Sequence, residues 1–438
     1  MHTTVAPTPA QQQTALWAST FAFTVCFAVW TIFSIIGVQI KKELGLNDTQ
    51  FGLLIAMPIL SGSLSRLFLG IWTDQFGGRR VFTAVMLCAA AATWLLTFMS
   101  SYEGYLFAAL LIGLAGGSFS VGIPYVSKWF PPEKQGTVLG IFGAGNIGAA
   151  VTKLLAPMVM VAMGWKAVAS YWAIGLAATA VLFFLLTRED PDQIRRASGE
   201  IKPTPFVEQL RPLRNLQVWR FGLYYFFVFG AFVALALWLP RLMVGAYGLD
   251  IKTAGLLAAL YSIPASLFRI VGGWLSDRIG ARKVMYWTFG VSVACTFLLS
   301  YPPTTYVVQG IRGPIEFTLA MGVVPFTVLI FVLGFFMSLG KAAVYKHIPV
   351  YYPQHVGAVG GVVGMIGGLG GFVLPIAFGA LNDLIGIWTS CFMLLFVLVS
   401  VALTWMHFAI RRMERARFPQ ITRETDLPEI MAAASERR

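Results

Sequence analysis

The feature that most constrains this chain is a series of long apolar stretches separated by short polar interruptions. A helix of ~20 apolar residues is long enough to cross the hydrocarbon core of a bilayer. The apolar windows fall at 17–39, 51–72, 81–99, 104–127, 136–161, 167–187, 218–240, 253–275, 284–301, 318–344, 356–380 and 386–409. We therefore predict an all-α integral membrane protein with twelve transmembrane helices.

The composition supports this prediction and excludes other classes of protein. The chain is 57% apolar and only 12% charged, whereas soluble proteins carry about 25% charged residues. Twelve spans leave little of the 438 residues for an appended catalytic or nucleic-acid-binding domain. No Lys or Arg precedes the first apolar stretch, so we expect it to be retained as a span and not cleaved as a signal peptide. The four cysteines are scattered singly and predict neither a disulfide framework nor a metal site.

The distribution of basic residues predicts the orientation of the chain. The longest polar stretch contains Pro191, Pro203, Pro205 and Pro212 and separates six spans from six. Placing it in the cytoplasm puts 22 of the 32 Lys and Arg on that side and 6 on the other, which predicts cytoplasmic termini. Most of the +13 net charge is therefore topological and does not indicate nucleic acid. The predicted units are an N-terminal half (1–187), a linker (188–217), a C-terminal half (218–410) and a tail (411–438).

A sequence motif occurs once in each half. RLFLGIWTDQFGGRR begins at Arg66 and RIVGGWLSDRIGARK begins at Arg269, 203 residues later. Repeated six-helix halves predict an alternating-access transporter whose site lies between the halves near the membrane midplane. The loop after the second and eighth spans resembles the signature of the major facilitator superfamily. An acid at a helix end can form a latch in one conformation and release it in the other, although these basic residues could also serve topology alone. The candidate latch residues are Asp74, Arg79, Arg80, Asp277, Arg282 and Lys283.

Four cations lie well inside predicted spans: Arg66, Lys153, Arg269 and Lys341. An ionisable residue at this depth costs at least ~2.5 kcal/mol and normally has a partner. The 19 acids fall in loops, span ends, the linker or the tail, and Glu316 lies just before the tenth span. A positive centre without an internal counter-charge predicts an anionic substrate. Arg66 and Arg269 occupy equivalent positions, and guanidinium groups suit flat oxyanions.

The remaining cations are candidates for coupling to protons. A buried amine or imidazole can lose its proton, whereas a guanidinium stays charged. The coupling candidates are Lys153, Lys341, Lys346 and His347. Backbone bonding or snorkelling to a span end is the alternative explanation for the four intramembrane cations.

Glycine-rich stretches in the fifth and eleventh spans indicate which family within the superfamily the chain resembles. Glycine lets transmembrane helices approach closely and slide past one another, although static packing is the alternative. Together with the paired arginines, these stretches resemble the nitrate/nitrite porter family, over about residues 15–410. The glycines that match the two signatures are Gly143, Gly145, Gly148, Gly361, Gly364, Gly367, Gly368, Gly370 and Gly371.

The resemblance implies a function and a set of binding residues. Arg66 and Arg269 would clamp the anion, Asn146 would hydrogen-bond it, and Tyr225, Phe229 and Phe119 would line aromatic walls. Gly364 stands where exchangers of the family often have serine. Together with the extra lysines, this departure favours proton-coupled nitrate uptake in the inner membrane of a bacterium, by a monomer that needs no cofactor or metal.

The sequence is also compatible with other functions. Within the family the alternative is exchange of nitrate for nitrite. Formate, oxalate or an organic phosphate are alternative anions, and a nitrate sensor without transport is an alternative of another class. An enzyme is disfavoured, because the sequence shows no nucleophile and base pair, metal cluster or phosphate loop.

Overall fold

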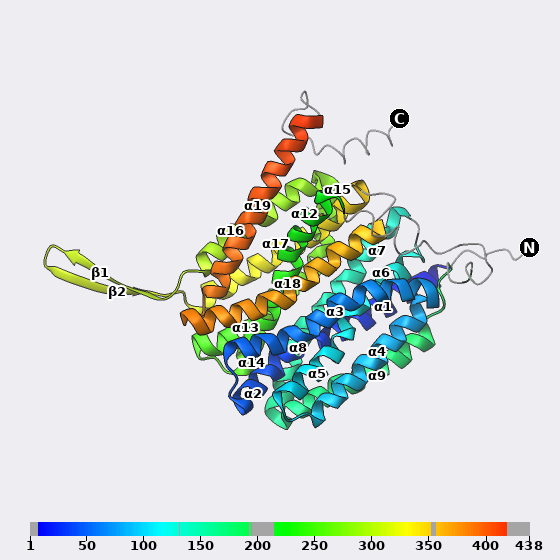
Figure 1. Cartoon of the computed structure of the whole chain (residues 1–438), viewed down its shortest axis with the longest axis horizontal. Helices are drawn as coiled ribbons and strands as arrows, with labels where there is room; N and C mark the ends of the chain where they lie inside the picture. Colours follow the sequence, from blue (N-terminus) through cyan, green and yellow to red (C-terminus); the bar gives the residue numbers. More distant parts are fainter. Residues whose placement is uncertain (1–7, 131, 192–193, 195–213, 352–355, 418–438) are drawn as a thin grey trace, which may run out of the picture.

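The computed structural model describes residues 8–130, 132–191, 194, 214–351 and 356–417. It is a bundle of long helices with one hairpin projecting from it (Figure 1). Ten helical stretches of the described residues are long and apolar enough to cross a membrane. The predicted all-α membrane fold is thus confirmed, whereas the predicted number of twelve is not established. Two further helices of the bundle, α3 (Asp48–Phe76) and α16 (Ala281–Leu299), are 29 and 19 residues long but are not among the ten.

The N-terminal helices α1 to α9 precede the linker region in the chain. Several of the apolar stretches are interrupted helices, such as α1 with α2, or α7 with the 3-10 turn η2 and α8. Besides α3, the elements are α1 (Pro9–Trp30), α2 (Phe33–Leu44), α4 (Gly78–Leu95), η1 (Leu96–Phe98), α5 (Tyr102–Ile112), α6 (Leu114–Ser127), α7 (Pro132–Gly143), η2 (Ala144–Ile147), α8 (Gly148–Met163) and α9 (Trp165–Leu186).

The C-terminal helices α12 to α19 follow the linker region. A π-helical segment, η4, joins α12 to α13 inside one apolar stretch. Besides α16, the elements are α12 (Leu216–Tyr225), η4 (Phe226–Ala231), α13 (Phe232–Tyr247), α14 (Ile251–Leu267), α15 (Arg269–Ile279), β1 (Thr304–Gly310), β2 (Gly313–Leu319), α17 (Val323–Tyr351), α18 (Val356–Ile385) and α19 (Ser390–Arg417).

The repeated motif produces the same turn twice. Gly77 ends α3 with φ 88° and ψ 140°, and Gly280 ends α15 with φ 91° and ψ 136°. Positive φ is unfavourable for residues with a Cβ, so glycine is required at both positions. The sequence repeat thus corresponds to a repeat in backbone geometry.

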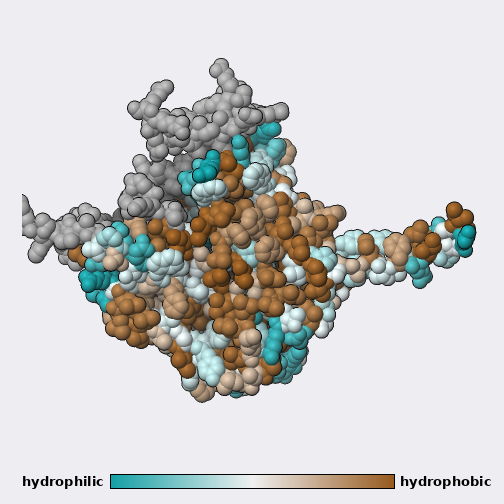
Figure 2. Space-filling view, turned by 180° about the vertical axis from the view of Figure 1, so that it is seen from behind, coloured by the Kyte–Doolittle hydropathy of each residue, from teal (hydrophilic) through white to brown (hydrophobic). Residues whose placement is uncertain are grey.

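The two groups of helices pack against each other along glycine-containing surfaces. Helix α18 packs against α3, and α14 packs against α8; Figure 1 shows α18 beside α3. A Cβ at Gly52 of α3 would lie 2.4 Å from the Pro375 carbonyl oxygen of α18, so the backbones are in close approach there. Apolar side chains cover much of the outer surface seen in Figure 2, as expected for helices that face lipid.

The hairpin differs from the sequence prediction. The tenth span was expected from residue 318, but residues 304–310 and 313–319 form paired antiparallel strands and α17 begins at Val323. The segment TTYVVQG is rich in β-branched and aromatic residues, which favour strands over helix. The apolar windows left residues 302–317 as a connection between two spans, and hydropathy alone does not identify strands there.

The predicted boundaries in the rest of the chain are tested only in part. Helix α19 continues to Arg417, past the expected start of the tail at residue 411. Most of the predicted linker, at residues 192–193 and 195–213, and residues 418–438 of the tail lie outside the described residues. The division into two halves therefore stays a prediction.

Candidate functional site

Arg66 and Arg269 lie on helices from the two ends of the chain. Arg66 is on α3, and Arg269 is the first residue of α15. Pro264 precedes the junction between α14 and α15, where Phe268 leaves helical geometry at ψ 2°. Proline cannot donate to the preceding turn and commonly interrupts a transmembrane helix. The junction therefore places Arg269 at a helix break.

The two guanidinium groups meet at one aromatic ring. The Phe119 ring centroid lies 5.5 Å from Cζ of Arg66 and 5.6 Å from Cζ of Arg269. The side chains are almost fully buried, at 4% and 6% exposed. We call Arg66, Arg269 and Phe119 the arginine cluster. The structure thus brings together the two arginines that the repeat placed at equivalent positions.

The two arginines differ in their hydrogen bonding. Arg66 donates from Nε to the Gly116 carbonyl at 3.4 Å and from Nη1 to the Gly364 carbonyl at 3.0 Å. The second bond joins an N-terminal helix to a C-terminal one. Nη1 of Arg269 is buried without a partner in the part of the chain that the structure describes, and a Cβ at Gly143 would lie only 3.1 Å from this atom. A larger residue at 143 would therefore press on the free N–H groups.

Neither arginine, nor either buried lysine, forms a salt bridge within the described residues. Lys153 donates to the Ala149 carbonyl at 3.0 Å, and Lys341 donates to the Ala265 carbonyl at 2.6 Å. Both lysines are fully buried. Both lysines thus bond to backbone carbonyls, which was the alternative explanation for cations inside the spans. A carbonyl oxygen carries no formal charge, so these bonds do not neutralise the ammonium groups. Uncompensated positive charge at this depth favours an anion.

Aromatic side chains surround the arginine cluster. Tyr225 stacks on Phe229 at 5.1 Å with an interplanar angle of 7°, and Phe229 lies 5.2 Å from the Arg66 guanidinium. Tyr345 lies 5.0 Å from Tyr225 and 5.6 Å from the Arg269 guanidinium. Sequence reasoning missed Tyr345, although it follows Lys341 by one helical turn. Its contact with Arg269 depends on the orientation of α17, which a hydropathy pattern does not give.

Several buried polar groups in this region have no hydrogen-bond partner among the described residues. They include both amide atoms of Asn146, the Tyr225 hydroxyl and the Ser63 hydroxyl. Asn146 is 1% exposed and follows Gly143 by three residues. An unsatisfied buried polar group costs about 1–3 kcal/mol, so such groups normally bind a ligand or water. Three of the predicted binding residues thus have free donor atoms: Arg269, Asn146 and Tyr225.

The four coupling candidates occupy different environments. Lys341 lies 3.3 Å above the Phe232 ring and 5.9 Å from the Phe229 ring, which also contacts Arg66. The Lys153 ammonium instead bonds within its own helix, and its carbonyl oxygen would lie 2.4 Å from a Cβ at Gly255. Within the described residues, Lys341 shares the Phe229 ring with Arg66 of the arginine cluster, whereas Lys153 shares no aromatic ring with the cluster.

Lys346 contacts the second sequence motif, and His347 contacts a backbone carbonyl and aromatic rings. Lys346 forms an ion pair with Asp277 at 2.5 Å. His347 Nδ1 contacts the Ala343 carbonyl oxygen at 2.8 Å, and its ring lies 5.5 Å from Phe221 and 5.9 Å from Tyr351. These contacts do not involve the arginine cluster.

Arg79, Arg80 and Arg282 each contact a partner within their own group of helices. Arg79 donates to the Phe184 carbonyl at 3.0 Å, and Arg80 pairs with Glu189 at 3.1 Å. Arg282 donates to the Tyr351 hydroxyl at 3.1 Å. The Asp74 side chain lies outside the described residues, and Lys283 has no hydrogen bond or ion pair with any described residue. A latching role for these groups therefore stays a prediction.

The glycine signatures provide close contacts with the binding region. A Cβ at Gly367 would lie 2.3 Å from Tyr225, and one at Gly368 would lie 2.2 Å from the Ser63 hydroxyl oxygen. These positions therefore require glycine for the observed packing. Gly361, in contrast, has no atom of the described residues within 4 Å of its Cβ position.

A second polar network joins the two groups of helices at the end of the bundle opposite the N-terminus. The Asp48 carboxylate pairs with Lys41 at 3.0 Å and with Arg241 of α13 at 3.2 Å, and it accepts a bond from Asn382 of α18. The Asp383 carboxylate accepts from the backbone N–H of Asp48 at 3.1 Å. We call these five residues the Asp48 network. This network was missed from the sequence, because Lys41 and Arg241 entered only as two of the six basic residues on the side opposite the linker.

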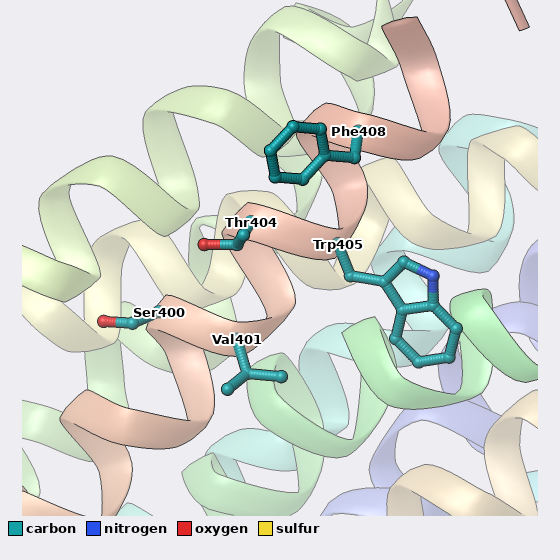
Figure 3. A pocket seen from close by; sticks show the side chains of 5 residues that line it. All are labelled: Ser400, Val401, Thr404, Trp405 and Phe408. Carbon is teal, nitrogen blue, oxygen red and sulfur yellow. The ribbon is translucent and has the colours of Figure 1, made fainter. Parts of the chain in front are cut away.

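The shallow pocket in Figure 3 is separate from these sites. It is lined by five residues of α19 alone: Ser400, Val401, Thr404, Trp405 and Phe408. None belongs to the arginine cluster or the Asp48 network. With Val401 52% and Phe408 67% exposed, it is part of the outer apolar surface.

The fold and the arginine cluster define the class of protein. Apolar membrane-spanning helices that enclose buried cations between N- and C-terminal helices are typical of a multi-pass membrane transporter. A model of the Major Facilitator Superfamily matches residues 18–324 and 242–433. The chain belongs to this superfamily and, on the relatives below, to its nitrate/nitrite porter family.

Three similar relatives are bacterial proteins. The chain is 45% identical over 414 residues to a probable nitrate/nitrite antiporter of Thermus thermophilus, covering 91% of each chain. It is 30% identical over 388 residues to the nitrite extrusion protein of Bacillus subtilis, covering 88% of this chain and 92% of that one. It is 32% identical over 377 residues to a probable nitrate/nitrite transporter of Mycobacterium tuberculosis, covering 85% and 90%.

A solved structure shows the same fold. The bacterial homologue of the human lysosomal transporter Spinster matches with a TM-score of 0.67 at 14% identity, covering 92% of this chain and 98% of that one. The family assignment confirms a transporter and not an enzyme.

Proposed function

We propose that the protein transports nitrate, and nitrite as a second substrate, by alternating access, with the anion held between Arg66 and Arg269. The names of the relatives support these substrates. The observation that carries the proposal is the position of two buried guanidinium groups on one Phe119 ring, without a carboxylate partner in the described residues.

The chemistry of the arginine cluster suits a small planar monoanion. A guanidinium offers parallel N–H donors that match two oxygens of a flat oxyanion. Nitrate stays ionised and weakly basic near neutral pH, so fixed positive charge can bind it without a proton donor. The free Asn146 amide and Tyr225 hydroxyl would supply further donors. Aromatic walls favour a weakly hydrated anion over phosphate or sulfate.

Binding and transport are tested separately. Nitrate should raise the thermal unfolding temperature of the purified protein, whereas phosphate and formate should not. Counterflow of labelled nitrate in proteoliposomes then distinguishes a transporter from a sensor, because a sensor would be stabilised without moving label. Stabilisation by formate alone would reject nitrate as the substrate.

We propose proton coupling through Lys341 for net uptake. Lys341 is the buried lysine that shares Phe229 with the arginine cluster, so a bound anion would favour its protonated form. In Lys341→Met, stimulation of nitrate uptake by an inward proton gradient should be lost, whereas counterflow should persist because exchange needs no net proton movement. The measurement is uptake into proteoliposomes with and without a gradient of about one pH unit.

The control is Lys153→Met, the same change at a buried lysine that bonds within its own helix. This variant should keep the stimulation. Full stimulation in Lys341→Met would reject that residue as the proton carrier. Uptake by the unchanged protein that neither acidifies the lumen nor responds to the gradient would reject symport and favour nitrate/nitrite exchange, the activity named for the Thermus relative.

We place the protein in the inner membrane as a monomer with both termini in the cytoplasm. The distribution of Lys and Arg supports this orientation. It puts the Asp48 network on the outer side and the two motif loops on the inner side. A single chain supplies both arginines, so the proposed site needs no second subunit.

A further inference from the structure

The hairpin formed by β1 and β2 has two chemically different faces. The register pairs Tyr306 with Phe317 and Val308 with Ile315. These side chains share one face, because alternate residues of a strand point to the same side. The Tyr306 and Phe317 rings stack at 5.5 Å.

The other face of the hairpin is more polar. Thr305 is hydrogen-bonded to Thr318 at 2.9 Å between their hydroxyl oxygens, and the pair of Val307 and Glu316 follows. Glu316, the acid that the sequence placed near the tenth span, is thus exposed on this face. The hairpin is therefore amphipathic.

The apolar face is not covered by the bundle. Figure 1 shows the hairpin extending away from the helices beside α16 and α19, with no labelled element next to it. The exposed fractions are 57% for Ile315, 49% for Phe317 and 106% for Ile311 at the tip. An isolated two-stranded hairpin with an exposed apolar face is marginally stable in water, which indicates that something covers it.

The hairpin joins the bundle where the surfaces of the neighbouring helices are also apolar. Its strands follow α16 after Leu299 and precede α17 at Val323, and seven-residue strands reach only ~23 Å. Phe297 and Val324, which flank it on those helices, are 59% and 74% exposed. The apolar surface of the two helices thus continues towards the hairpin, as Figure 2 also shows.

The charged residues of the hairpin also indicate what kind of surface its apolar face contacts. Arg312 at the turn is the only cation between Lys283 and Lys341, and the single acid, Glu316, lies on the opposite face from Phe317. Aromatic residues concentrate at the lipid–water interface, and basic residues near it bind phosphate headgroups. An apolar, aromatic face ending in one arginine therefore matches a lipid surface.

We propose that the hairpin is a membrane-surface anchor whose apolar face lies in the lipid–water interface, with Arg312 at the headgroup phosphates. Because it joins α16 to α17, it ties the C-terminal helices to one leaflet. The anchor is independent of the identity of the transported anion.

The test compares two neighbouring positions on opposite faces. Ile315→Cys and Glu316→Cys are made in a Cys88→Ser background, since Cys88 is exposed and the other three cysteines are buried. Each is labelled with an environment-sensitive fluorophore in nanodiscs that hold one transporter in phosphatidylcholine and phosphatidylglycerol. The label at 315 should emit at shorter wavelength, be quenched by lipid-borne nitroxide and be protected from iodide several-fold more than the label at 316.

Arg312→Gln supplies a second test, because it leaves the strands unchanged. With Arg312 present, nitroxide quenching should be stronger in discs that contain phosphatidylglycerol than in discs of phosphatidylcholine alone. Arg312→Gln should abolish this difference. Equal iodide quenching at 315 and 316, with no nitroxide effect, would overturn the anchor. Protection of 315 only in discs that hold two transporters would also overturn it and would assign the face to a second copy of the chain.

Discussion

Replacing either arginine of the arginine cluster by lysine should lower nitrate counterflow by about 100-fold or more. Lysine keeps the charge but loses the fork of parallel donors, and two lost charge-assisted hydrogen bonds correspond to about 3 kcal/mol, or roughly 100-fold. Arg66→Lys also loses the geometry of its bonds to the Gly116 and Gly364 carbonyls. The measurement is the initial rate of counterflow at equal amounts of reconstituted protein.

The matched control is Arg412→Lys, the same exchange at an exposed residue of α19. It should leave counterflow unchanged. Nitrate-dependent thermal stabilisation should disappear in the two cluster variants while they remain monodisperse, which separates loss of binding from misfolding. Full counterflow in both cluster variants would reject the clamp.

Asp48→Asn should shift the transporter towards the state that is open at the Asp48 network. The carboxylate is the shared partner of Lys41 and Arg241, and neutralising it leaves both cations without their ion pair. These pairs are partly exposed, so we expect about 1–2 kcal/mol, which corresponds to a shift of roughly tenfold between the two states. Only the closed state loses these bonds, so its population should fall.

Spin labels at Lys42→Cys and Leu384→Cys, in a Cys88→Ser background, would report the separation of the N- and C-terminal helices at this end. Both positions are exposed. The distance distribution should gain a longer component in Asp48→Asn. Asp250→Asn is the control, because asparagine also caps a helix and Asp250 caps α14 without bridging the two groups. An unchanged distribution in Asp48→Asn would show that the network does not hold this end closed.

The fold could be predicted from sequence because its determinants are local. Runs of apolar residues define membrane helices, and the 203-residue spacing of Arg66 and Arg269 identified two equivalent positions that the structure brings to one ring. The hairpin was missed, because residues 302–317 fell between two apolar windows, and a hydropathy pattern does not identify strands in such a connection.

The remaining parts of the site depend on the orientation of helices far apart in sequence. Tyr345 reaches Arg269 only through the rotation of α17. Asp48 meets Arg241 across 193 residues. Lys346, a candidate for coupling, pairs with Asp277. A charge count identifies such residues but not their partners.

The bond between Arg66 and the Gly364 carbonyl has a consequence for the transport cycle. It supplies an internal partner for one guanidinium when the substrate is absent, and it connects the two groups of helices at the centre. An anion that draws Arg66 towards itself competes with this bond, so loading the carrier loosens a central tether. The unloaded carrier keeps this bond between α3 and α18, so its reorientation has to break a tether that the loaded carrier has already released. We therefore expect counterflow, in which the carrier returns loaded, to be faster than net uptake, in which it returns empty.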